Sequence, residues 1–320
     1  MRKFAVKLFI AMFPLILYLG LFIAYEPYNY YGIKDDFSGS WTTPLARIRA
    51  YQRKPSENII LGDSRMNHFD TGLIQDMTGD YYANLSTGGQ GLNLTWEMYQ
   101  WANKQRMLKK VVVDSSFWQI RAGNNSPSAE QVFYIAEHPL EYPFTLDYVR
   151  EAWDEMLKEW GIKDSILNDE DDSIEVKEAI QKNTKYQEYL VRYAVGNIYP
   201  GTENYTIGNE QLDYIINIVQ TTKDNGGEVK ILIPCVQESI WEYVLTPLNL
   251  EPQLMEYKSY LSQYAPLYDM EWQNEVSYRQ DIFADGFHFV DRETYNDIYT
   301  SILFGEPNEN VKIWNNGSFN

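Results

Sequence analysis

Apolar and polar positions along most of the chain follow the spacings of buried strands and amphipathic helices. Four short apolar runs predict buried strands: 58–61, 81–85, 109–115 and 229–234. Helical spacing predicts four helices between or after them: 71–77, 93–107, 209–223 and 292–303. Strands that alternate with helices in this way imply right-handed crossovers. The pattern therefore predicts an α/β fold with a doubly wound parallel sheet flanked by helices.

A longer apolar run precedes these four and predicts a membrane-spanning helix. Leu8 to Tyr25 contains eighteen residues without a charge, which as a helix would measure about 27 Å, near the lower limit for crossing a bilayer. Arg2, Lys3 and Lys7 precede the run, which predicts a cytoplasmic amino terminus and an extracytoplasmic remainder. We interpret residues 1–26 as a single-pass transmembrane signal anchor in the cell membrane. A cleaved signal peptide is the alternative, although no clear small-x-small site follows the run.

Two segments interrupt the strand–helix rhythm. Residues 27–55 predict a juxtamembrane linker with a short amphipathic helix at 44–52, whose arginines face solvent. Within a catalytic domain at 56–320, residues 124–207 predict a helical insert that resembles a cap or lid. Its acidic stretch at 168–172 lacks the glycine and spacing of a calcium loop, so we interpret it as a solvated loop.

Charge and cysteine content narrow the function classes. The net charge of −18 argues against a nucleic-acid-binding protein, which would show a basic face. The single cysteine, Cys235, excludes an internal disulfide and lies in an apolar run typical of a buried thiol. The sequence predicts no metal site and no cofactor.

The candidate chemistry begins at Gly62-Asp63-Ser64, directly after the first predicted strand. A serine at the carboxyl end of a strand in an open α/β sheet lies where such sheets bind their ligands. Its hydroxyl can also lie near backbone N–H groups that stabilise negative charge. The alternative is that Asp63 and Ser64 only form a strand-to-helix turn.

Acyl transfer by a serine needs a base, a group that orients the base, and donors for the oxyanion. The chain has three histidines. His68 is too close to Ser64 along the chain to reach back easily, and His138 lies in the irregular insert. His288 precedes the last predicted helix, where the sheet would bring it to the strand ends, and Asp285 lies three residues earlier as a hydrogen-bond acceptor for the imidazole.

These blocks resemble the SGNH/GDSL superfamily of serine esterases and acyltransferases over about residues 58–303, without the insert. The resemblance implies a flavodoxin-like (SGNH) fold, with Ser64 as nucleophile, His288 as base and Asp285 as the acid that orients it. It also implies an oxyanion-hole glycine after the second strand, which Gly89 matches best, with Gly88 as the neighbouring candidate.

One part of the sequence departs from the family pattern. The family's third block usually supplies an asparagine donor just after the third strand, but residues 114–119 read Asp-Ser-Ser-Phe-Trp-Gln. Asn93, Asn124 and Asn125 lie nearby, and none can be assigned to this role. Loss of such a donor in a serine protease costs about 3–4 kcal/mol.

The missing asparagine, the anchor and the insert together resemble a membrane-tethered bacterial subgroup of that superfamily, which includes the teichoic acid D-alanyl transfer protein and exopolysaccharide O-acetyltransferases. This resemblance implies extracytoplasmic acyl transfer through acyl-Ser64 to a glycan or wall polymer, with a membrane-bound O-acyltransferase as partner. Three tryptophans are candidates for sugar stacking: Trp96, Trp118 and Trp241. Two alternatives stay open, an esterase that removes such acyl groups and a noncatalytic membrane-tethered scaffold.

Overall fold

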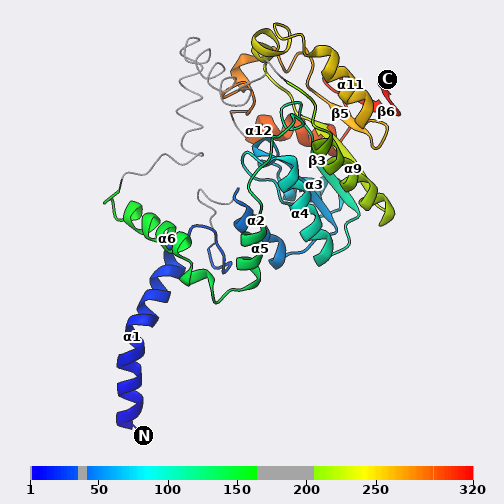
Figure 1. Cartoon of the computed structure of the whole chain (residues 1–320). Coiled ribbons are helices and arrows are strands. Elements are labelled where there is room, and N and C mark those ends of the chain that lie inside the picture. The colour runs from blue at the N-terminus through cyan, green and yellow to red at the C-terminus, as the bar shows by residue number, and fades with distance from the viewer. Residues whose placement is uncertain (1, 35–41, 164–204, 291, 320) are drawn as a thin grey trace. The chain divides into compact units, whose positions relative to one another are not determined.

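The structure, a computed structural model, describes residues 2–34, 42–163, 205–290 and 292–319 (Figure 1). These residues form two compact units. The first consists of the described residues up to Arg53 together with residues 130–163, and the second consists of residues 54–129 and 205–319. The acidic stretch at 168–172 and the rest of the predicted insert from 164 to 204 lie outside the described residues.

The first unit is helical. Its elements are α1 (Arg2–Tyr25), α2 (Pro44–Arg53), α5 (Glu130–Glu137), the 3-10 turn η2 (Tyr142–Phe144) and α6 (Leu146–Glu159). Within α1, Lys7–Tyr25 is long and apolar enough to cross a membrane, a criterion that a signal sequence also meets. Part of the predicted insert thus folds with the N-terminal segment.

Glu26 lies at the centre of this unit. Its buried carboxylate accepts hydrogen bonds from the backbone N–H groups of Tyr28 and Tyr30, at 2.9 and 2.8 Å, and from the Tyr142 hydroxyl at 2.9 Å. The rings of Tyr30 and Tyr142 stack with their centroids 4.0 Å apart. Residues of the predicted linker and of the predicted insert therefore share one core.

The prediction that the α2 arginines face solvent is confirmed for Arg53, which is exposed, and is wrong for Arg47, which is buried, and for Arg49, which is half-buried. Arg49 Nε donates to the Tyr30 carbonyl at 3.0 Å, Arg53 Nη1 donates to the Asn29 carbonyl at 2.9 Å, and Arg47 is buried. Amphipathic spacing identifies the apolar face of a helix, but it does not show that unpaired loop carbonyls will cover the polar face.

The second unit is an α/β domain with a mostly parallel seven-stranded sheet, in the strand order β2-β1-β3-β4-β5-β6-β7 within the described residues. The strands are β1 (Asn58–Leu61), β2 (Ala83–Asn84), β3 (Lys110–Asp114), β4 (Glu228–Ile233), β5 (Leu267–Asp269), β6 (Lys312–Asn315) and β7 (Ser318–Phe319). β1 to β5 are parallel, and β6 and β7 add an antiparallel edge. The four predicted strands are all present.

Helices and short helical turns connect the strands. They are η1 (Ser64–Met66), α3 (Thr71–Thr78), α4 (Leu92–Gln105), α9 (Asn209–Asp224), α10 (Glu238–Ile240), the π-helical turn η4 (Trp241–Leu245), α11 (Glu251–Leu261), η5 (Gln280–Ile282), α12 (Arg292–Tyr295), the π-helical turn η6 (Asn296–Thr300) and α13 (Ser301–Phe304). On one side of the sheet, Ile60 and Val112 pack with Ile74 of α3 and Ile302 of α13. α4 and α9 contact each other and pack on β1 and β4, respectively.

Candidate active site

The nucleophile candidate Ser64 begins η1, three residues after β1 ends. Gly62 makes this turn possible. Its φ of +149° is rare for residues with a side chain, and a Cβ there would lie 2.4 Å from Asp114 Oδ1 and 2.5 Å from Met66 Cγ. A glycine at this position lets the chain pass close to β3 and leaves the Ser64 side chain partly exposed.

The structure brings Ser64, His288 and Asp285 together. Ser64 Oγ lies 2.6 Å from His288 Nε2, and His288 Nδ1 lies 2.7 Å from Asp285 Oδ2. The second carboxylate oxygen of Asp285 accepts the backbone N–H groups of Phe287 and His288 at 3.0 and 2.9 Å. The loop therefore holds its own carboxylate in place, and the carboxylate favours the imidazole tautomer that has a proton on Nδ1 and a free Nε2 facing Ser64.

The charges around this chain of hydrogen bonds shift both pKa values. Burial disfavours the imidazolium of His288, but the carboxylates of Asp285 and Asp63 outweigh burial and raise the pKa of His288. Burial also opposes the charge of Asp285, yet the neighbouring His288 and the two N–H donors lower the pKa of Asp285 to about 2. The side chains of His288 and Asp285 remain 33% and 28% exposed, so a substrate can reach them.

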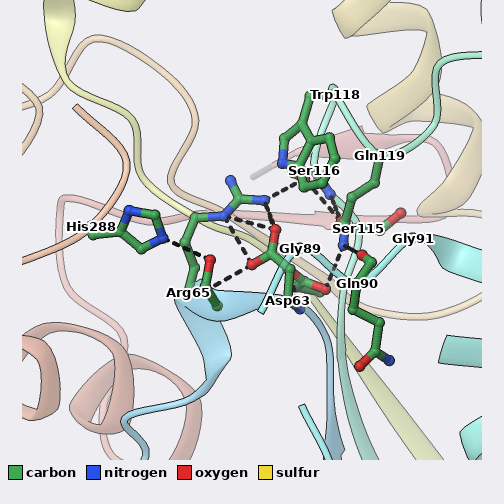
Figure 2. Close-up of polar contacts among 12 residues, drawn as sticks. Asp63, Arg65, Gly89, Gln90, Gly91, Ser115, Ser116, Trp118, Gln119 and His288 are labelled. Atoms are coloured by element: carbon green, nitrogen blue, oxygen red, sulfur yellow. Dashed lines mark hydrogen bonds and ion pairs between the residues drawn. The ribbon is translucent and has the colours of Figure 1, made fainter. Parts of the chain in front are cut away.

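A buried ionic network includes Asp63 and Arg65, the residues on either side of Ser64 (Figure 2). Arg65 Nη2 lies 2.6 Å from Asp63 Oδ2 and donates to Ser116 Oγ at 2.5 Å, and it lies 3.8 Å from Asp114 Oδ2. The guanidinium of Arg65 outweighs burial and lowers the pKa of Asp63, while burial and the nearby Asp63 raise the pKa of Asp114 well above its usual range. The network joins the loop after β1 to the loop after β3.

The glycine candidates lie in the loop after β2. Thr87 N–H donates to the Gly62 carbonyl at 3.0 Å, which places this loop beside the nucleophile turn. Gly88 and Gly89 follow directly, both exposed, and Gly89 has a φ of +65°. No described residue accepts a hydrogen bond from the N–H of Ser64 or Gly89. Both groups therefore remain able to donate to a substrate oxygen.

Gln119 occupies the region where the family pattern has an asparagine, but its amide is fully used. Its Nε2 donates to the Gln90 carbonyl at 3.1 Å and to Asp114 Oδ1 at 3.2 Å. Its Oε1 accepts the N–H and the hydroxyl of Ser116, each at 2.9 Å. Gln119 thus ties the loop after β3 to the residue that follows Gly89 (Figure 2).

The three asparagine candidates have structural roles. Asn93 exchanges hydrogen bonds of 2.8 Å with the backbone of Ser126 in both directions. Asn124 Nδ2 donates to the Trp118 carbonyl at 3.0 Å, and Asn125 Oδ1 accepts from Gln211 at 3.1 Å. Their side-chain amides are therefore used in hydrogen bonds between protein segments.

The remaining histidines make ring contacts outside the Ser64–His288–Asp285 chain, and the tryptophans differ in their distance from the site. His68 packs edge-on against Tyr295, with ring centroids 5.9 Å apart, and exposed His138 stacks on Tyr134 in the first unit. Of the three tryptophans, Trp118 lies beside the ionic network, with the Arg65 guanidinium 5.8 Å from its ring (Figure 2). Trp96 stacks on Tyr99 within α4.

Sequence reasoning missed Arg65, Ser116 and Gln119 as parts of the site. A signal was present, because Asp114 to Ser116 are polar residues at the end of a strand that is otherwise buried, where polar side chains need partners. Among the described residues, no group of three or more His, Cys, Asp or Glu side chains is arranged to hold a metal ion.

Comparison with known proteins adds a weak structural likeness. No family model and no curated protein matches the chain. A protein from Streptococcus pneumonia, provisionally described as a platelet activating factor, matches with a TM-score of 0.41 and 10% sequence identity, over 81% of this chain and 89% of that chain. A likeness at this level shows neither a shared fold nor a shared function.

Proposed function

We propose that this chain is a membrane-anchored serine O-acyltransferase of the SGNH type, which acts outside the cytoplasm on a glycan or wall polymer. The observation that supports it most is the continuous hydrogen-bond chain from Ser64 through His288 to Asp285. The strand order 2-1-3-4-5 of the parallel strands agrees with a flavodoxin-like sheet, whose ligands bind where the order reverses, between β1 and β3. Ser64 follows β1 at that point.

The proposed reaction has two steps, acylation of Ser64 and transfer of the acyl group to an acceptor. Ser64 Oγ gives its proton to His288 Nε2 and attacks the carbonyl carbon of the acyl donor. Asp285 stabilises the imidazolium, and the N–H groups of Ser64 and Gly89, with Gly88 as the neighbouring candidate, hold the oxyanion. The leaving group takes the proton from His288, which leaves acyl-Ser64. An acceptor hydroxyl then loses its proton to His288 and attacks the acyl carbon. As the bond from the acyl carbon to Ser64 Oγ breaks, His288 returns the proton to Ser64 Oγ, which frees the serine.

The anchor and the partner follow from the same proposal. Lys7–Tyr25 would hold the catalytic unit at the outer face of the membrane, where a membrane-bound O-acyltransferase could supply the acyl group. Indole rings stack well on sugars, and Trp118 lies beside the site network, so it is the tryptophan we assign to the acceptor side.

Labelling with a fluorophosphonate probe tests the nucleophile without an acyl donor. We expect the full chain in detergent to be modified at Ser64, and we expect Ser64→Ala and His288→Ala to lose the modification. Exposed Ser318→Ala is the matched control and should label as the wild type does. A full chain that leaves Ser64 unmodified while its fold is intact would contradict serine catalysis and favour the scaffold.

A second assay separates a transferase from an esterase. With p-nitrophenyl acetate we expect a Ser64-dependent burst, followed by turnover that accelerates when oligosaccharide acceptors are added and that yields acylated sugar. Turnover that is indifferent to the acceptor, with acetate as the only product, would instead identify an esterase with the same residues.

A further inference from the structure

The segment from η2 to α6 packs along the carboxyl-terminal part of α1 within the first unit (Figure 1). The Tyr18 hydroxyl donates to the Pro143 carbonyl, and the Tyr18 and Phe144 ring centroids lie 6.1 Å apart. One turn further along α1, Phe22 packs edge-on against Tyr142, at 5.1 Å. Trp160 Nε1 donates to the Tyr25 hydroxyl at 3.0 Å. These contacts place the segment beside the part of α1 from Tyr18 to Tyr25.

Phe144 lies below the outer end of the apolar helix, beside Tyr18, whereas Trp160 lies at that end, beside Tyr25. Tyr18 precedes Tyr25 by seven residues, which corresponds to about 10 Å along the axis of an α-helix. If Lys7–Tyr25 spans a bilayer, Tyr18 lies in the outer leaflet, and so does whatever packs against it. Phe144 is therefore held at the depth of the boundary between headgroups and acyl chains.

Large apolar side chains of this segment and of the residues next to it are exposed rather than packed on the unit's core. We call them the α6 apolar surface: Leu140, Phe144, Leu146, Trp153, Trp160 and Ile162, between 55% and 84% exposed. Leu146, Trp153 and Trp160 recur every seven residues and so share one side of the helix. Asp147, with a side chain 82% exposed, directly follows Leu146 and so lies on another side of the helix. Arg150, with a side chain 69% exposed, is four residues after Leu146 and three before Trp153, so it borders the apolar side.

We propose that the α6 apolar surface is embedded in the interfacial layer of the same bilayer that holds α1, and that the segment slopes through this layer from Phe144 to Trp160 as a second, monotopic attachment. The contacts with Tyr18 and Tyr25 select lipid as the occupant, because the surface continues from the lipid-facing side of the anchor. Tryptophan and tyrosine rings at this level match the aromatic belt of membrane interfaces. The inference rests on α1 crossing the membrane.

Site-directed fluorescence on the full chain tests the proposal. Single cysteines are introduced as Leu140→Cys and Trp153→Cys on the surface, Asp147→Cys on the polar side as matched control, and Leu15→Cys within α1. Cys235 is buried, and unsubstituted protein measures its background labelling. Each variant carries an NBD fluorophore and is reconstituted into phosphatidylcholine vesicles with or without a nitroxide-labelled phosphatidylcholine.

We expect the labels at 140 and 153 to be blue-shifted and quenched by the lipid nitroxide at least about twofold more than the label at 147, as an interfacial segment requires. Aqueous iodide should show the reverse order. Quenching at 15 without quenching at 140 and 153 overturns the inference while α1 remains a membrane helix. No quenching at 15 overturns the anchor as well. Protection at 140 and 153 from both quenchers, varying with the protein-to-lipid ratio, would assign the surface to a second copy of the chain instead.

Discussion

At the residue scale, the hydrogen bond between His288 and Asp285 predicts the pH dependence of acylation. His288 must be neutral to accept the Ser64 proton, and its pKa is raised because the carboxylates of Asp285 and Asp63 outweigh burial. Activity should therefore fall on the acidic side with a midpoint above about 6.5, the ordinary value for histidine. Asp285→Asn should move this midpoint to lower pH and slow the burst by a factor on the order of 10⁴.

The measurement is the burst rate constant with p-nitrophenyl acetate between pH 5 and 9. His138→Ala is a suitable control, since exposed His138 lies in the first unit and should leave the profile unchanged. An acidic limb that stays in place in Asp285→Asn would show that another group controls the titration.

A second residue predicts how stability depends on pH. Glu271 is buried, and burial raises the pKa of Glu271 to about 7, despite the opposing charge of Lys258. The folded protein keeps a proton that the unfolded chain loses near pH 4.5. Stability should thus fall by about 3 kcal/mol as the pH rises from about 4.5 to 7.

Glu271→Gln should remove this loss, because the neutral amide resembles the protonated acid. Urea unfolding followed by tryptophan fluorescence should show the variant close to wild type at pH 4.5 and more stable than wild type at pH 8. Exposed Glu275→Gln is the matched control. An unchanged pH slope in Glu271→Gln would mean that Glu271 is ionised in the folded state.

At the element scale, the loops after β1, β2 and β3 form the site together with the segment after β5 that carries Asp285 and His288. Gln119 links the loop after β2 to the loop after β3. Gln119→Met keeps the length of the side chain but removes both donated hydrogen bonds and leaves the Gln90 carbonyl without that partner. We expect kcat to fall about 100-fold, comparable to the loss of one oxyanion donor. KM should change little, because the acyl donor does not need this side chain for binding.

Steady-state kinetics and thermal unfolding of Gln119→Met check this expectation together. Gln220→Met serves as the control, since Gln220 pairs with Asp224 on the exposed side of α9. If kcat and stability fall in proportion, Gln119 has only a structural role. A loss of kcat at nearly unchanged stability supports its role in positioning Gly89.

The strands and helix caps show which elements the sequence could predict. β1, β3 and β4 are apolar runs bounded by turn residues, so periodicity found them, and Asp70 and Gly79 cap α3 as their residue types suggest. β5 has three residues, too few to show a period. β6 and β7 were missed although Asn316 and Gly317, with φ of +52° and +84°, form the type of hairpin turn that Asn-Gly favours.

The sequence likewise predicted some residues of the candidate site and missed others. Ser64, Asp285 and His288 came from short blocks whose chemistry is local, whereas the Gln119 link joins residues 29 positions apart and depends on how two loops approach each other. Hydrophobic periodicity cannot predict such a contact between two loops. The same holds for Glu26 and Tyr142, 116 residues apart, whose hydrogen bond is one reason that the predicted linker is a folded part of the first unit.

At the scale of the whole molecule, the two units should respond differently to removal of the N-terminal segment. A chain that begins at residue 27 lacks Phe22 and Glu26, so Tyr142 loses its ring contact and its acceptor. A hydrogen bond to a charged acceptor contributes about 1.5–3 kcal/mol, and Glu26 accepts three of them. Residues 130–163 should then open, while the sheet unit keeps its own core.

Limited trypsin digestion with mass spectrometry measures this difference. In the chain that begins at residue 27 we expect early cleavage at Arg150 and Lys158, and in the full chain in detergent we expect both sites to be protected. Glu26→Ala in the full chain should reproduce the early cleavage although α1 is present, whereas exposed Glu141→Ala should not. Equal resistance of all four proteins would mean that residues 130–163 are held by something other than Glu26. Early cleavage only in the chain that begins at residue 27 would assign the effect to α1 itself.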